Sequence, residues 1–412
     1  MNNKIKLAVA GAVFSAASVA NAGIVIPAGD WTLDVNGNVN AFANFTSYDS
    51  KATDTITGAI AGREDVDGED NVQGINTGLL PAWLGFTGTT RQNDVDVSFT
   101  ISFQPNVSAN DTMGDVLTPL NRQAFVTFGD KSWGTVKLGK DLGIFAGQAI
   151  LNDMTLLGVG GGAAKSGAQT TLGGIGTGYI YPSWKGQISY TTPNMNGFEA
   201  TIAVTNPDQG VAFSSGGAGT TTNNNAYQGR LGIEAQAMYS WTGDVAGKVW
   251  VSGASYDYQA SETSTAFTTD GSHTSDAYDI GATITTGNLT LTGYYFDSEG
   301  MGSRLLGENA FDEQSGSIKA RDVDGGYVQA TYVIPTGTKL GLAYGVNNID
   351  KASGELDSNL AKKNDRWTIG AYHPLTKHLN LVAEYNKITS EAHDSTKDAE
   401  QDTLSLGAIL FF

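Results

Sequence analysis

Apolar and polar residues alternate along most of this chain, from about residue 31 to its last residue. Between residues 94 and 104, for example, valine, phenylalanine and isoleucine occupy every second position, with polar residues between them. Successive side chains of a β-strand point to opposite faces, so this pattern predicts strands with one apolar and one polar face. We predict sixteen strands, at residues 31–46, 79–90, 94–104, 121–129, 133–140, 181–192, 197–206, 227–242, 245–260, 276–286, 288–298, 322–335, 338–349, 364–374, 378–389 and 401–412.

The connections between these strands alternate between short and long. Those after even-numbered strands are a few residues of turn-forming type, such as Gly243-Asp244 and Pro335-Thr336-Gly337. Those after odd-numbered strands are mostly long and rich in glycine, aspartate, serine and threonine, such as residues 47–78 and 141–180. Membrane barrels sort their connections in this way, with short turns at one end and long loops at the other. The sequence therefore predicts an all-β protein, a closed antiparallel transmembrane barrel of sixteen strands.

The first 22 residues are predicted to be a cleaved signal peptide. Lys4 and Lys6 form a basic head, Leu7 to Ala20 are apolar or small, and Ala20-Asn21-Ala22 has the small-residue pattern of a cleavage site. The apolar run is shorter than the roughly 20 residues that a membrane-spanning helix needs. We therefore expect an exported chain whose residues 23–412 form one barrel domain.

Composition and charge narrow the class further. Only 40% of the residues are hydrophobic and no second long apolar run occurs, which excludes a helical membrane protein. The net charge of −18 argues against a nucleic-acid partner. It suits divalent cations and a lipopolysaccharide surface bridged by them. We interpret the acidic runs at 64–70 and 321–325 as solvated loop faces, and predict no cofactor beyond loosely bound Ca²⁺ or Mg²⁺ there.

Catalysis and pure adhesion are weaker alternatives. The chain has four histidines and no nucleophile motif, metal-ligand set or phosphate-binding glycine loop, so we predict that it is not an enzyme. A soluble, β-rich surface protein would also be exported and acidic. It would have no reason to sort its loops by length, however.

Three stretches and the last residue resemble a known family. Residues 121–126, 133–140 and 189–198, together with the terminal Phe412, are similar to general diffusion porins of Gram-negative outer membranes. The resemblance implies a homotrimer of sixteen-stranded barrels, with the third long loop, residues 141–180, folded into each lumen to constrict it. It also implies that Phe412 is the signal read by the outer-membrane barrel assembly machinery.

The function implied by this resemblance is passive diffusion of ions and small hydrophilic solutes through a water-filled channel in the bacterial outer membrane. From the acidic charge we expect a mild preference for cations. The expected partners are other copies of the chain, outer-membrane lipid and lipopolysaccharide. A substrate-specific channel and a non-conducting surface adhesin stay open as alternatives.

Alternation also predicts which charged residues face the lumen. If the apolar positions face lipid, then their neighbours face water inside the barrel. Asp141 and Asp153 belong to the third long loop. Arg122 and Lys140 lie near strand ends, where alternation does not determine which face a side chain points to. A basic wall facing carboxylates on the loop would create a transverse field that sorts solutes by charge. The predicted pore-lining residues are Lys137, Lys140, Lys185, Arg230, Arg366, Arg122, Asp141, Asp153, Asp96 and Glu234, with Asp279 and Glu384 also facing inward.

A closed barrel should survive dodecyl sulfate until it is heated, because every strand is hydrogen-bonded on both sides. We expect unheated protein to migrate differently from boiled protein on a detergent gel. A soluble β-rich adhesin would show one mobility under both conditions, and that result would exclude the barrel.

Overall fold

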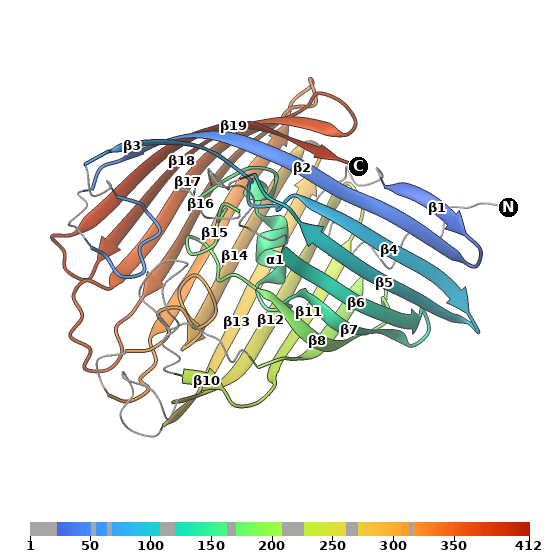
Figure 1. The fold of residues 1–412 in the computed structure, drawn as a ribbon, viewed down its shortest axis with the longest axis horizontal. Helices are drawn as coiled ribbons and strands as arrows, with labels where there is room; N and C mark the ends of the chain where they lie inside the picture. Colours follow the sequence, from blue (N-terminus) through green and yellow to red (C-terminus); the bar gives the residue numbers. More distant parts are fainter. Residues whose placement is uncertain are drawn as a thin grey trace, which may run out of the picture.

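The computed structural model describes residues 23–50, 55–63, 68–107, 120–162, 170–207, 226–260, 271–312 and 316–412. The predicted signal peptide and part of the acidic run at 64–70 lie outside them. The described strands form one antiparallel sheet that closes into a sixteen-stranded barrel, which confirms the predicted fold class (Figure 1).

The barrel strands follow one another around the wall in chain order. They are β2 Trp31–Tyr48, β4 Trp83–Gln92, β5 Val95–Gln104, β6 Leu120–Asp130, β7 Gly134–Leu142, β8 Trp184–Thr191, β9 Phe198–Thr205, β11 Gly232–Trp241, β12 Val245–Ala260, β13 Ser272–Thr286, β14 Leu289–Glu299, β15 Asp322–Val333, β16 Lys339–Ile349, β17 Ala361–Pro374, β18 Leu379–Ala392 and β19 Asp398–Phe411. Their bounds differ from the predicted ones by a few residues.

The barrel closes where the last strand meets the first. β19 pairs with β2 in an antiparallel register that sets Ala408 opposite Ala41. Beyond the last pair of this ladder, the backbones of Gly37 and Phe412 exchange two hydrogen bonds of 2.8 and 3.0 Å. The terminal residue therefore completes the seam at the short-turn end.

The two faces of the wall follow the predicted alternation. On β17, Trp367 and Ile369 are 49% and 60% exposed on the outer face, whereas Arg366 and Thr368 between them are buried inside. The outer face is apolar because it meets hydrocarbon, and the inner face carries the polar side chains. No helix in the described ranges is long and apolar enough to cross a membrane.

Two short strands were missed by the sequence analysis. β1, Ile24–Ala28, pairs with the start of β2, and β3, Asn71–Asn76, pairs with the end of β2. Both lie where β2 extends beyond a neighbouring barrel strand, β19 on one side and β4 on the other. They satisfy backbone groups of β2 that would otherwise lack partners. Neither shows the alternation that reveals the longer strands.

The predicted strand at 227–242 is wrong as one continuous element. It is divided into β10, Ala226–Gln228, and β11, with residues 229–231 outside either strand. The ladder between β11 and β9 ends at Gly232, opposite Thr205. Beyond that pair only β12 remains as a partner, so the chain can leave the sheet.

The third long loop lies inside the barrel. It holds a short helix α1, Gly147–Asn152, and a 3₁₀ turn, Met154–Leu157. In Figure 1, α1 lies across the inner side of the barrel wall. Residues of this loop pack with inward side chains of β12 to β18 in an apolar cluster that includes Phe145, Tyr294 and Tyr327. One side of the lumen is therefore filled.

A buried ion pair fastens two loops at the long-loop end. Arg321 donates to Glu355 through Nε and Nη2, at 2.9 and 2.6 Å, and the Ala352 backbone amide also donates to this carboxylate, at 2.9 Å. Burial alone would raise the pKa of Glu355, but these hydrogen bonds and the Arg321 charge hold it below its usual value.

This ion pair should make the stability of the folded protein depend on pH. A carboxylate whose pKa is lower in the folded state stabilises that state above the unfolded pKa. The contribution is lost as the pH falls through the folded pKa. We expect the thermal stability gap between the wild type and Glu355→Gln to shrink between about pH 6 and pH 3, as measured by melting in detergent. A constant gap would contradict the assigned role.

Candidate functional site in the barrel lumen

A carboxylate on β11 binds the third long loop at the point where the loop enters the lumen. Glu234 Oε2 accepts hydrogen bonds from the backbone amides of Ile144 and Phe145, at 2.5 and 3.1 Å. Its other oxygen accepts from Lys185 Nζ at 2.6 Å and from the Tyr256 hydroxyl. Glu234 therefore accepts hydrogen bonds both from the backbone of the loop and from a lysine of the barrel wall.

The next anchors hold helix α1 against β13 and β15. Asp279 Oδ2 accepts from the backbone amide of Ala146 at 3.1 Å, and the Tyr327 hydroxyl donates to the carbonyl of Ala149 at 2.8 Å. Ala146 has a φ of 58° and precedes the helix. This left-handed conformation is costly for alanine, and it persists because the amide is fixed by Asp279.

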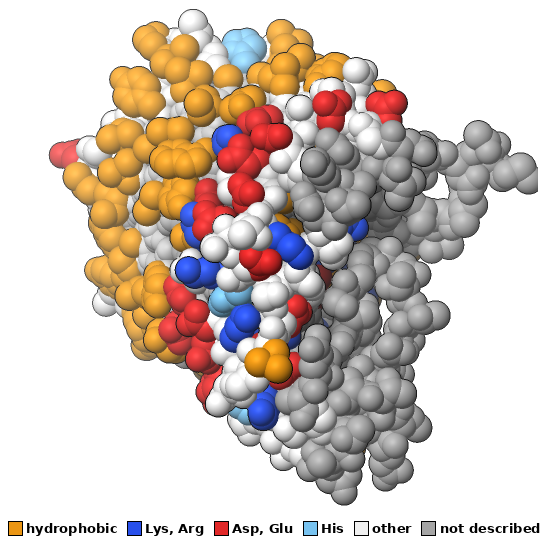
Figure 2. Space-filling view, turned by 90° about the vertical axis from the view of Figure 1, so that its left-hand side faces the viewer, with side chains coloured by type: hydrophobic (Ala, Val, Ile, Leu, Met, Phe, Trp, Pro, Cys, Tyr) orange, Lys and Arg blue, Asp and Glu red, His pale blue; other side chains and the backbone are white. Residues whose placement is uncertain are grey.

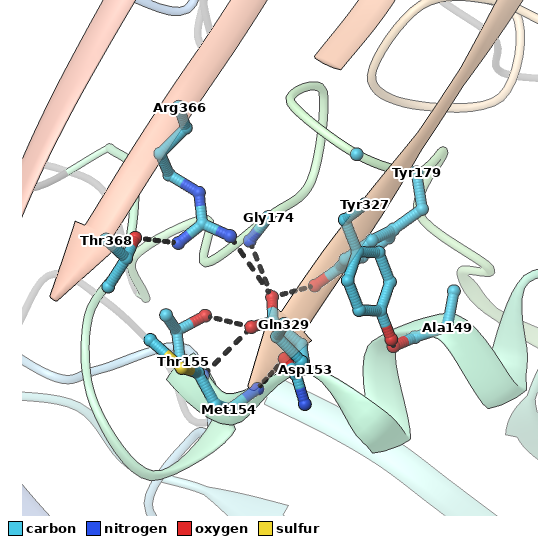
Figure 3. Close-up of polar contacts among 12 residues, drawn as sticks. Ala149, Asp153, Met154, Thr155, Gly174, Tyr179, Tyr327, Gln329, Arg366 and Thr368 are labelled. Atoms are coloured by element: carbon cyan, nitrogen blue, oxygen red, sulfur yellow. Dashed lines mark hydrogen bonds and ion pairs between the residues drawn. The ribbon is translucent and has the colours of Figure 1, made fainter. Parts of the chain in front are cut away.

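Asp153 lies at the centre of the loop's polar contacts (Figure 3). Its Oδ1 accepts from the amide and hydroxyl of Thr155 at 2.9 and 2.7 Å, and its Oδ2 accepts from the Gly174 amide and the Tyr179 hydroxyl, both at 2.9 Å. Arg366 of β17 lies 3.7 Å from Oδ2. Burial and the Asp153 charge raise the pKa of Tyr179, so its hydroxyl remains a donor. Asp153 thus ties both arms of the loop to the wall.

A fourth carboxylate, on β18, accepts hydrogen bonds from the loop backbone. Glu384 Oε2 accepts from the amides of Val159 and Gly160, both at 2.9 Å, while its Oε1 accepts from the Tyr372 hydroxyl at 2.6 Å. Any Cβ at position 158 would collide with the Glu384 carboxylate. A larger residue would have to displace this carboxylate from its hydrogen bonds, which favours glycine at position 158.

These anchors all lie on one side of the barrel. The loop is held against β11 to β18, and β4 to β9 belong to the other side of the wall. Many inward residues of β4 to β9 bear hydroxyls and several are partly exposed, with cross-strand contacts such as Thr87 to Thr100 at 3.1 Å and Thr191 to Thr201 at 2.9 Å. The same wall also carries partly exposed charged side chains such as Asp96 and Lys137, so it is polar and can be wetted by water.

The predicted charged residues are largely paired. Lys137 Nζ lies 2.5 Å from Asp141, Lys185 binds Glu234, and Arg366 faces Asp153. The carboxylates of these pairs are buried, with Asp141 and Asp153 only 1% and 2% exposed at their side chains. The loop therefore does not present its two carboxylates to the open lumen, in contrast to the expected transverse field.

Other predicted residues lie away from the inserted loop. Arg230 is exposed in the bend between β10 and β11, and Lys140 is exposed on the outer face of β7. Asp96 pairs with Arg91 at 2.9 Å near a short turn. Arg122 lies at a bulge in β6, with its guanidinium 5.9 Å from the Trp184 ring. Of these, the structure places none among the loop anchors, and a pore role for them stays a prediction.

The sequence analysis missed Lys248 on β12. Its ammonium donates to Gln148 of α1 at 2.9 Å, so it lies in the lumen beside the inserted loop. The sequence did contain a signal for its position. Val249 and Val251 are apolar and face outward, so alternation places Lys248 on the inner face. Within the described ranges, no group of histidine, aspartate and glutamate side chains is arranged to hold a metal ion.

Comparison with known families gives a match over nearly the whole chain. A family model described as Gram-negative porin matches residues 7–393. No curated protein sequence matches the chain.

Solved structures share the fold at low identity. The outer membrane channel DcaP of Acinetobacter baumannii is 16% identical, with a TM-score of 0.68, and the match covers 95% of this chain and 100% of that one. The anion-selective porin from Comamonas acidovorans is 15% identical, with a TM-score of 0.59 and coverage of 93% and 100%. The trimer form of OmpT, an outer membrane protein of Vibrio cholerae, is 15% identical, with a TM-score of 0.55 and coverage of 93% and 99%.

Replacing Asp153 with asparagine should loosen the loop. The substitution keeps the shape of the side chain but leaves the buried Arg366 without a carboxylate, which costs about 3 kcal/mol in comparable pairs. We expect faster amide hydrogen exchange at Gly174 and Thr177, with the barrel strands unchanged. Asp141→Asn is the matched control, because its partner Lys137 keeps access to water. Equal protection of Gly174 in Asp153→Asn and the wild type would contradict the anchoring role.

Proposed function

This chain belongs to the Gram-negative porin family and is an outer-membrane channel, and we propose that it works by passive diffusion of ions and small hydrophilic solutes. The observation that carries the proposal is the passage left beside the inserted loop. Its wall on β4 to β9 is rich in hydroxyls, several of them partly exposed, whereas β11 to β18 hold the inserted loop. Family and fold both point to a channel rather than an enzyme.

We further propose a mild preference for cations, favoured by the acidic surface around the mouth. Asp276, Glu299 and Asp322 are successive cross-strand neighbours on the outer wall near the long-loop end, and the exposed Asp350 follows beside Asp322. Figure 2 views this end and shows acidic side chains gathered there. Together with the net charge of −18, such a mouth raises the local concentration of cations.

The same acidic surface supports the expected partners. We propose that loosely bound Ca²⁺ or Mg²⁺ bridges it to lipopolysaccharide, because carboxylate and phosphate oxygens are the ligands that these ions prefer. We also propose a homotrimer, supported by the trimeric form among the structural neighbours. Recognition of Phe412 by the barrel assembly machinery stays a prediction.

Single-channel recording in a planar bilayer tests the proposal. We expect open, ohmic current steps in multiples of three in KCl, with a reversal potential in a salt gradient that indicates K⁺ preference. Steps that a particular solute blocks would instead indicate a substrate-specific channel. A heat-modifiable barrel without conductance would contradict the channel and favour an adhesin.

A further inference from the structure

Two lumen cations have no carboxylate within 4 Å in the described part of the chain. Lys137, Lys185 and Arg366 each have such a partner, whereas Lys248 and Lys339 do not. Lys339 lies with its ammonium 4.8 Å from the centre of the Tyr372 ring. Lys248 differs because it contacts the inserted loop and is partly exposed.

Lys248 is partly exposed, and the water it meets is inside the barrel. It faces inward on β12 and its Nζ donates to Oε1 of Gln148, which belongs to the loop, at 2.9 Å. A protonated lysine has three donors, so two N–H groups remain after this bond. In the register, Lys248 lies directly opposite Thr283 of β13, whose hydroxyl is on the same face.

Gln148 adds a second donor group at the same place. Its Oε1 accepts from Lys248 and, more weakly, from Asn152 at 3.5 Å, which orients the amide. Its Nε2 therefore carries two N–H groups, for which the described residues supply no acceptor. The inward carboxylate of Asp279 lies on the same strand, four positions before Thr283. Its oxygens already accept from Ala146, Ser252 and Tyr294.

We propose that Lys248 and Gln148 form a binding subsite for the carboxylate or phosphate group of a small solute, and that Lys248 is a specificity-determining residue of the channel. The proposal rests on the proposed channel function. A cationic N–H donor and a neutral one that lie next to each other, beside a hydroxyl-bearing neighbour, match an oxyanion, and charge-assisted bonds of this kind are the strong ones. The acidic mouth and this subsite act at different depths, so cation enrichment outside and oxyanion binding within are compatible.

Bilayer recordings in gradients of potassium acetate and potassium phosphate test the subsite. We expect Lys248→Met to lower the permeability of both anions relative to K⁺ by about fivefold, the effect of one unit charge at about 4 Å in water. Gln148→Glu should give a similar loss, because the new carboxylate would pair with Lys248. Lys248→Arg should retain anion permeability.

Lys131→Met is the matched control, since it removes the same charge from the exposed short turn after β6 and should leave the ratio unchanged. A loss confined to phosphate would assign the subsite to phosphate-bearing solutes, and an equal loss would assign it to oxyanions in general. Unchanged ratios in Lys248→Met and Gln148→Glu channels that still conduct KCl would overturn the subsite and leave the channel function standing. Absence of KCl conductance in the wild type would instead overturn the channel.

Discussion

Every peptide group in a wall that faces lipid needs a hydrogen-bond partner from the protein itself, because hydrocarbon supplies none. In this chain that constraint reaches beyond the closure of the barrel. β2 is longer than its neighbours on both sides, and β1 and β3 pair with the parts that extend past them. The terminal Phe412 pairs with Gly37 for the same reason. Both ends of the described chain are thus part of the wall.

The same requirement governs the loop inside the barrel. A loop packed against a wall loses water at its backbone amides, and an unpaired buried amide is costly. Here wall carboxylates take the place of water: Glu234, Asp279 and Glu384 accept from successive loop amides, while Asp153 on the loop accepts from both of its arms. The buried acids of the lumen therefore shape the passage, and the charges that passing solutes meet lie elsewhere.

Much of this architecture could be predicted from the sequence, because alternation is a local signal. The strand at Val245–Ala260 has the predicted bounds, and Lys185 and Glu234 lie inside as alternation requires. The site was less predictable, because nothing local shows which wall carboxylate meets which loop amide. The strand at 227–242 was predicted as continuous for a related reason, since the point where β9 ends decides whether residues 229–231 stay in the sheet.

The long sequence separation of the loop anchors has a consequence for assembly. The acceptors of Ile144, Ala146 and Val159 lie 90, 133 and 225 residues further along the chain. Contacts between such distant residues form slowly, because the entropy of closing a long segment must be overcome first. The loop can settle only after β18 has taken its place, next to the final strand. A half-assembled wall would therefore enclose a wider opening than the finished one, and narrowing would be among the last events of folding.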